Sequence, residues 1–270
     1  EVGLKQLYTS GQSHLAHIEE ITKNAMEDFG GRPSIFYKNV EPYLKYLKEN
    51  VNEIAFNIKK NNIIVTSTLW VHESGYDQDI DLSNFLKNIE LEYANPGMVE
   101  GSRLSRGWLP GNNPYEQPNK SAEQTKNAKL YWKTYADALH IVAKALLKHD
   151  VTIIAGTDAN TNGTVPGYSL HDELVSLKNV GMSNTQVLRA ATLDAAKWMQ
   201  VNTGKIAVGY RADLILLDKS PLEEIKNTRT INTVITNGKL LDRTVLDEIL
   251  LSIKGANNKS RKVNIDKFIK

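Results

Sequence analysis

Side chains with catalytic or metal-ligating chemistry lie at or just beyond the ends of three strand-like segments. The segments are residues 13–18, 63–70 and 151–156, and the side chains are His17, Thr68, His72 and Asp158. In a βα barrel, the carboxyl ends of the strands meet at one face and form the active site. Imidazole nitrogens and carboxylate oxygens bind divalent metals, and a carboxylate can also act as a general base. We therefore expect these side chains to share one face of the fold.

Two interpretations of Asp158 remain open. Directly after the apolar run Val151–Gly156, its backbone would close a buried strand and its carboxylate would lie at the strand mouth. There it could act as a metal ligand and general base. Aspartate also opens turns, because its side chain can bond to the backbone two residues further on.

The histidines differ in what they could do. His14 and His17 are three residues apart, so on a strand they face opposite sides and cannot bind the same centre. His171 lies near the start of a helix that we expect to begin at Ser169, where Ser169–Asp172 fits a capping box. A protonated imidazole is disfavoured at that end of a helix. We therefore expect His171 to be neutral and to act as a hydrogen-bond partner.

The elements that must position these residues alternate between strands and helices, which is typical of a βα barrel or a doubly wound sheet. Apolar residues at spacings of three and four predict helices over 40–60 and 121–149. Ser183–Gln186 fits a second capping box and predicts another helix start. After residue 200, strands are predicted at 212–218 and 231–236, and Asn237-Gly238 is a hairpin signal.

Residues 72–120 are interrupted by glycine and proline and predict a long insertion with one short helix near 82–93. Such an insertion in a compact domain is usually a lid or a binding loop. Its Arg103, Arg106 and Tyr115 are candidates for contacting a substrate carboxylate. The alternative is a structural loop with ordinary surface arginines.

Composition limits the classes of function. The chain has 270 residues, 41% of them hydrophobic and 24% charged, which is typical of one or two globular domains. The net charge of +2 does not suggest a nucleic-acid binder. No apolar run approaches the roughly 18 residues that cross a bilayer. The chain has no cysteine, which excludes disulfides, thiol catalysis and cysteine-ligated zinc. The compartment stays open.

A series of motifs in a fixed order gives a more specific indication. They are Ile154–Ala159, Val165–Leu174, Gly181–Ser183, Ala190–Ala196, Gly204–Leu214 and Val234–Gly238. This order resembles the metal-dependent amidohydrolase superfamily, especially its imidazolonepropionase-like and dipeptidase-like branch. The stretch Gly107–Tyr115 is also similar to that branch.

The resemblance implies an α/β fold made of the C-terminal part of a (β/α)8 TIM-like barrel and part of a small β-sandwich. Its expected divisions are 1–200 for barrel strands six to eight, with the insertion at 72–120, then 201–245 for the sandwich and 246–270 for a helical, basic tail. It also implies hydrolysis of C–N bonds in a small amide, cyclic amide or peptide-like substrate.

The site implied by the resemblance contains a divalent metal, one or two ions and zinc by preference, which activates water. His17 stands where the sixth strand presents a metal-binding histidine. Asp158 stands where the eighth strand presents an aspartate that ligates metal and acts as general base and then general acid. His171, Arg103, Arg106 and Tyr115 are the candidate substrate contacts.

The chain also departs from the family pattern. No His-x-His pair occurs among its six histidines, so we expect it to hold metal weakly or not at all and to be inactive by itself. Its partners are expected to be an N-terminal remainder of the same protein or further copies of the chain, without nucleic acid or membrane. A non-catalytic assembly or ligand-binding module on the same fold is the alternative. A nucleotide binder is disfavoured, because no Gly-x-Gly-x-x-Gly or Walker-type loop follows a strand.

Overall fold

The computed structural model describes residues 3–102, 105–117 and 119–263 and has a mixed α/β architecture. Three short strands are β1 (His14–Leu15), β2 (Ile64–Thr66) and β3 (Ile153–Ile154). The helices around them are α1 (Leu4–Thr9), α2 (Glu19–Asp28), α3 (Ile35–Lys38), α4 (Val40–Lys60), α5 (Leu69–Lys87), α6 (Pro96–Glu100), α7 (Ala122–Lys148), α8 (Tyr168–Asn179), α9 (Asn184–Ala190) and α10 (Leu193–Trp198). A short 3-10 helix, η1 (Leu91–Tyr93), precedes α6.

The three strands form one parallel sheet in the order β1-β2-β3. His14 pairs with Ile64, and Val65 pairs with both Leu15 and Ile153. Backbone pairing continues past the strands, because Thr68 N–H donates to the carbonyl of Gly156 over 3.1 Å. Since the strands are parallel, their carboxyl ends lie at one edge of the sheet.

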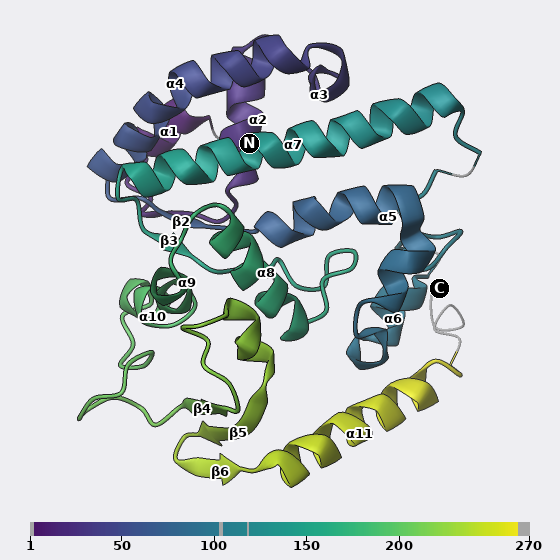
Figure 1. Cartoon of the computed structure of the whole chain (residues 1–270), viewed down its shortest axis with the longest axis vertical. Helices are drawn as coiled ribbons and strands as arrows, with labels where there is room; N and C mark the ends of the chain where they lie inside the picture. The colour runs from purple at the N-terminus through teal and green to yellow at the C-terminus, as the bar shows by residue number, and fades with distance from the viewer. Residues whose placement is uncertain (1–2, 103–104, 118, 264–270) are drawn as a thin grey trace.

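The helix α7 organises the core. It crosses the molecule between α4 and α5 and packs against both (Figure 1). Its predicted apolar stripe is buried at Tyr135, Leu139, Val142 and Leu146. The predictions of helices over 40–60 and 121–149 are confirmed by α4 and α7, and Ser121 closes a capping box with Gln124 at the start of α7.

The prediction for residues 63–100 is wrong in part. β2 ends at Thr66 and α5 begins at Leu69, so the end of the predicted strand is helical. The helix predicted near 82–93 is instead the last part of α5, which continues from Leu69 through a kink at Asp81. The start of α5 is stabilised by a carboxylate from α8, described below, which no local pattern indicates.

The two predicted capping boxes have different outcomes. The box at Ser183 and Gln186 is confirmed at the start of α9. The box at Ser169 is wrong, because α8 begins at Tyr168 after Gly167, whose φ is 81°. The hydroxyl of Ser169 instead donates to the carbonyl of Val165 over 2.8 Å.

After α10 the chain forms a second sheet, which is antiparallel and has the order β4-β5-β6. Its strands are β4 (Leu214–Leu217), β5 (Ile231–Thr236) and β6 (Lys239–Leu241). Asn237 and Gly238 have φ of 49° and 75°, as a type I′ hairpin turn requires. The 3-10 helix η2 (Ile225–Arg229) precedes β5, and α11 (Arg243–Ser260) follows β6.

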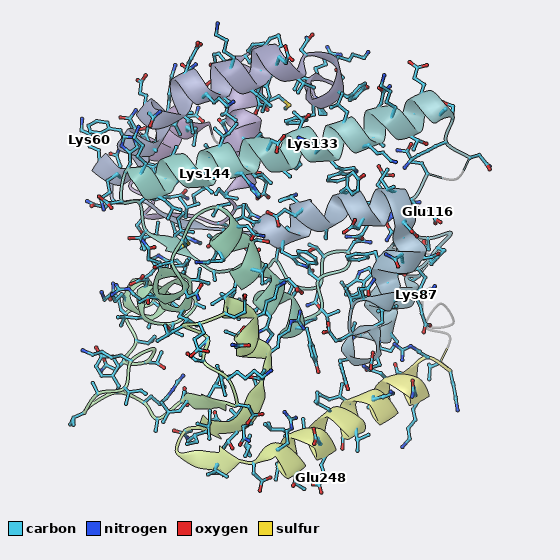
Figure 2. All side chains as sticks on the ribbon, in the orientation of Figure 1. Lys60, Lys87, Glu116, Lys133, Lys144 and Glu248 are labelled. Carbon is cyan, nitrogen blue, oxygen red and sulfur yellow. The ribbon has the colours of Figure 1, made fainter. Side chains whose placement is uncertain are left out.

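Charged side chains lie mainly at the periphery, as the labelled Lys60 of α4, Lys133 and Lys144 of α7 and Glu248 of α11 show (Figure 2). Within the described ranges, no helix combines the length and apolarity needed to span a membrane. Two glutamates, Glu19 and Glu173, are buried instead. Burying a carboxylate costs free energy unless polar partners surround it. We therefore look for polar partners around each of these two residues.

Candidate active site at the carboxyl ends of the parallel strands

Glu19 connects the ends of the first two strands. It is the first residue of α2 and is 5% exposed. Its Oε1 lies 3.0 Å from Nδ1 of His17. Its Oε2 lies 3.2 Å from Nε2 of His72, without the alignment of a hydrogen bond, and accepts a hydrogen bond from the hydroxyl of Thr68 over 3.0 Å. Burial favours the neutral carboxyl, but the imidazoles of His72 and His17 outweigh it and lower the pKa of Glu19 to about 2.

Thr68 is held in a strained conformation where β2 turns into α5. Its φ of 43° and ψ of 36° lie in the left-handed region, which a β-branched residue rarely adopts. Its hydroxyl is bound by Glu19, and its N–H is bound by the carbonyl of Gly156. Strain of this kind costs of order 1–3 kcal/mol and persists only where surrounding contacts impose it.

Glu173 of α8 stabilises the start of α5. It is fully buried, and its carboxylate accepts hydrogen bonds from the backbone N–H of Leu69 over 3.0 Å and of Trp70 over 2.7 Å. These are the first two residues of α5, whose N–H groups have no partner within the helix. Burial raises the pKa of Glu173 to about 7, although the hydrogen bonds oppose the shift.

Asp158 lies beyond β3 in an exposed, tight loop, with φ of 50°. Its backbone carbonyl closes the turn by accepting hydrogen bonds from the hydroxyls of Thr161, over 2.8 Å, and Thr164, over 3.2 Å. Its carboxylate accepts no hydrogen bond from the parts of the chain described. The turn therefore does not use the side chain, which is free for other chemistry.

The candidates in the insertion lie in different environments. Tyr115 packs edge-to-face on Trp132 with 5.4 Å between ring centroids. Burial and the nearby charge of Asp158 raise the pKa of Tyr115. Arg106 is exposed. Arg103 lies outside the described residues.

His171 lies toward the second sheet. Its Nδ1 is 2.9 Å from the hydroxyl of Thr228, which donates its own proton to the carbonyl of Ile225. His171 is therefore the donor in this pair. Burial and the charge of Arg229 lower the pKa of His171 to about 4, in agreement with the neutral imidazole expected here. The residue lines a cavity of about 370 Å³ between α8, β5 and α11, whose lining includes neither His17 nor Asp158.

The residues present do not by themselves fit a catalytic metal centre. Within the ranges that the structure covers, no group of three or more histidine, aspartate or glutamate side chains could hold a metal ion. His17 and Asp158 would supply two ligands, whereas zinc sites need at least three from protein.

Sequence reasoning selected His17, Thr68, His72 and Asp158 by their positions after strands, but it did not assign a role to Glu19 or Glu173. An acidic residue at a helix start, such as Glu19, is ordinary in sequence. Glu173 acts on residues more than 100 positions earlier, so nothing in its own neighbourhood indicates its role.

The chain is similar to known hydrolases. Residues 134–241 match the amidohydrolase family. An ochratoxinase from Aspergillus niger is 35% identical over 101 residues, which cover 35% of this chain and 20% of that enzyme. A 5'-deoxyadenosine deaminase from Methanosphaera stadtmanae is 25% identical over 260 residues, which cover 87% of this chain and 58% of the deaminase.

A solved structure of a bottromycin amidohydrolase superposes with a TM-score of 0.66 at 21% sequence identity. The match covers 95% of this chain and 51% of that protein, so it shows a shared fold. The chain thus spans a little over half the length of the deaminase and of the bottromycin amidohydrolase, and the ochratoxinase match covers a fifth of that enzyme.

Proposed function

From the amidohydrolase-family segment at residues 134–241, we propose that this chain is the C-terminal portion of a metal-dependent hydrolase of C–N bonds. The substrate class is a small amide, cyclic amide or peptide-like molecule. In this proposal β1, β2 and β3 are the sixth, seventh and eighth strands of a TIM-like barrel, and β4–β6 are part of a small β-sandwich. The fold likeness to the bottromycin amidohydrolase over 95% of the chain supports this arrangement.

The observation that carries the proposal is that the carboxylate of Asp158 is exposed and does not take part in closing its own turn. Its carboxylate is exposed just past the carboxyl end of β3, and the loop is closed by the backbone instead of the side chain. A carboxylate in this place can take a proton from an attacking water and pass it to the departing nitrogen. Among the proposed substrate contacts, Tyr115 is the one whose pKa is raised by burial and by the charge of Asp158.

The proposed zinc site, of one or two ions, is completed outside the described residues. His17 and Asp158 would be the share of this chain, and at least one further ligand must come from elsewhere. His171 and the two arginines, Arg103 and Arg106, remain proposed substrate contacts.

The test compares the purified 270-residue chain with a longer protein that contains it. We expect the chain alone, supplemented with zinc, to hydrolyse no N-acyl amino acid or dipeptide and to bind zinc below one equivalent. In the longer protein, Asp158→Asn should lower kcat by roughly 10²–10⁴-fold. The matched control is Asp150→Asn, which removes a carboxylate from the loop before β3 and should leave kcat unchanged.

Turnover by a homogeneous sample of the chain would contradict the first expectation. A longer protein that keeps its rate with Asp158→Asn would contradict the assignment of the general base. A longer protein that binds such amides without hydrolysing them would favour the alternative function, a non-catalytic ligand-binding module.

A further inference from the structure

We infer that Gln78 of α5 is a positioning residue, because it holds the turn 158–164, which carries Asp158, against the segment 107–115, which carries Tyr115. Gln78 is buried, with 1% of its surface exposed, and its side-chain amide hydrogen-bonds to both parts of the chain. The inference rests on the proposed function only for the roles of Asp158 and Tyr115. The arrangement itself is set by hydrogen bonds between described residues.

The first step is the contact of Gln78 with the turn. Its Nε2 donates a hydrogen bond to the backbone carbonyl of Asn162 over 3.0 Å. The approach is close, because a Cβ built on Gly163 would lie 3.0 Å from this Nε2 and 2.6 Å from Cε1 of Phe85. The turn is closed by its own backbone and hydroxyl hydrogen bonds, so holding Asn162 also restrains Asp158.

The second step is the contact with the segment 107–115, which is made through Asn113. Asn113 is 1% exposed, and its Nδ2 donates to the carbonyl of Trp108 over 2.9 Å and to Oε1 of Gln78 over 3.4 Å. Its Oδ1 accepts the backbone N–H of Tyr115 over 2.9 Å. One buried amide therefore closes the loop from Trp108 to Tyr115 and joins it to Gln78.

The orientations of the two amides are fixed independently by the backbone. A carbonyl can only accept a hydrogen bond and a backbone N–H can only donate one. The carbonyl of Asn162 therefore requires Nε2 of Gln78 to face the turn, which leaves Oε1 facing Asn113. The carbonyl of Trp108 and the N–H of Tyr115 orient Asn113 in the same way. The two amides then meet as donor and acceptor, and a satisfied buried network of this kind favours one arrangement.

Two further hydrogen bonds complete the connection. Nε2 of Gln78 also donates to the hydroxyl oxygen of Ser74 over 3.1 Å, and that hydroxyl donates to the carbonyl of Val71 over 3.0 Å. Nδ2 of Asn162 donates to the carbonyl of Gly107 over 3.2 Å. The turn is thus joined to the segment 107–115 directly and through Gln78, and α5 is the base to which both are attached.

The experiment is amide hydrogen exchange, resolved by residue with NMR, in the 270-residue chain. Gln78→Met keeps an unbranched side chain of similar size but removes its hydrogen bonds. We expect the N–H groups of Thr164 in the turn and of Tyr115 to exchange at least about five-fold faster than in the wild-type chain, because a lost buried hydrogen bond raises the population of the open loop by about this factor.

Asn113→Ala separates the two contacts. It should speed exchange at Tyr115 and leave Thr164 at the wild-type rate, because Gln78 still reaches the carbonyl of Asn162. The matched control is Asn84→Ala, which removes an exposed amide from the same helix and should change exchange in neither the turn nor the segment 107–115.

Unchanged exchange at Thr164 and Tyr115 in folded Gln78→Met would overturn the inference. A residue that contributed only to global stability would instead speed exchange in the core, as at Leu139 of α7, and leave the two loops unchanged. If Gln78→Met unfolds, as circular dichroism would reveal, the wild-type chain decides the question. Its spectrum should show a nuclear Overhauser effect between the side-chain amide protons of Gln78 and Hα of Gly163, and the absence of this effect would overturn the inference. Because these measurements need neither metal nor substrate, their outcome is independent of whether the chain belongs to an active hydrolase.

Discussion

At the residue scale, two buried carboxylates have pKa values that their surroundings shift in opposite directions. Glu19 faces two imidazoles and a hydroxyl, and its pKa falls to about 2. Glu173 faces backbone N–H groups in a fully buried position, and its pKa rises to about 7. Partial positive charge from a helix start therefore does not outweigh desolvation, whereas adjacent imidazoles do.

The shift of Glu173 predicts how stability depends on pH. Its folded pKa exceeds the unfolded value of about 4.3, so the unfolded state loses its proton first as pH rises. The associated stability is fully present below about pH 4.3 and is lost as pH rises through about 7, by about 4 kcal/mol in total. Glu173→Gln, which carries no titrating proton, should remove this part of the pH dependence.

Urea unfolding at pH 4.5, 6 and 8 measures the effect. The control is Glu248→Gln, at an exposed position of α11. Its free energy of unfolding should change with pH as that of the wild-type chain does. If the free energy of unfolding changed equally with pH in the wild-type chain and in Glu173→Gln, Glu173 would already be ionised in the folded protein at low pH.

At the scale of elements, the crossing of α5 and α7 depends on the absence of a side chain at Gly75. A Cβ built there would lie 2.4 Å from Cζ3 of Trp132, and the indole of Trp132 is held by a hydrogen bond to Asp79 over 2.9 Å. The close approach allows α5 to run beside α7, with Thr68 and His72 at its start facing Glu19.

Gly75→Ala should therefore destabilise the fold. The gain in helix propensity is about 1 kcal/mol, but displacing a packed ring costs typically 1–3 kcal/mol, and we expect a net loss of about 1 kcal/mol. Gly255→Ala is the matched control, because a Cβ on this α11 residue would meet nothing within 4 Å. It should raise stability by up to about 1 kcal/mol. Thermal unfolding of both variants checks the difference, and a Gly75→Ala chain as stable as Gly255→Ala would refute the packing argument.

At the scale of the whole molecule, the second sheet leaves apolar side chains uncovered. Ile215 and Leu216 of β4 are 61% and 62% exposed, and Leu240 of β6 is 64% exposed. Exposed apolar side chains on a sheet with an open edge favour association. The opposite end of the molecule, around α4 and α7, has a continuous buried core instead (Figure 1).

We therefore predict that the wild-type chain self-associates as its concentration rises, and that the double variant Ile215→Lys with Leu216→Lys sediments as a monomer. The control, Thr244→Lys with Asn258→Lys, adds the same charge at exposed polar positions of α11 and should associate like wild type. Sedimentation velocity over a range of concentrations distinguishes these cases. A wild-type chain that is monomeric throughout would contradict the prediction.

The sequence by itself determined the elements whose signals are local. The helices α4 and α7 follow from apolar spacing, the start of α9 from Ser183 and Gln186, and the hairpin from Asn237-Gly238. The rule that strand ends collect functional residues selected His17 and Asp158, and the ordered motifs indicated the amidohydrolase resemblance, which is confirmed by the match over residues 134–241.

Only the tertiary structure decided where α5 begins and which groups hold the strand ends together. Thr68 bonds to a carboxylate 49 residues earlier, and Leu69 bonds to one 104 residues later. The periodicity of a short segment reports which of its faces is buried, but not which distant side chain will satisfy its free N–H groups. That choice is made when the helices pack, because a carboxylate enters the core only where partners brought together by the fold offset its desolvation.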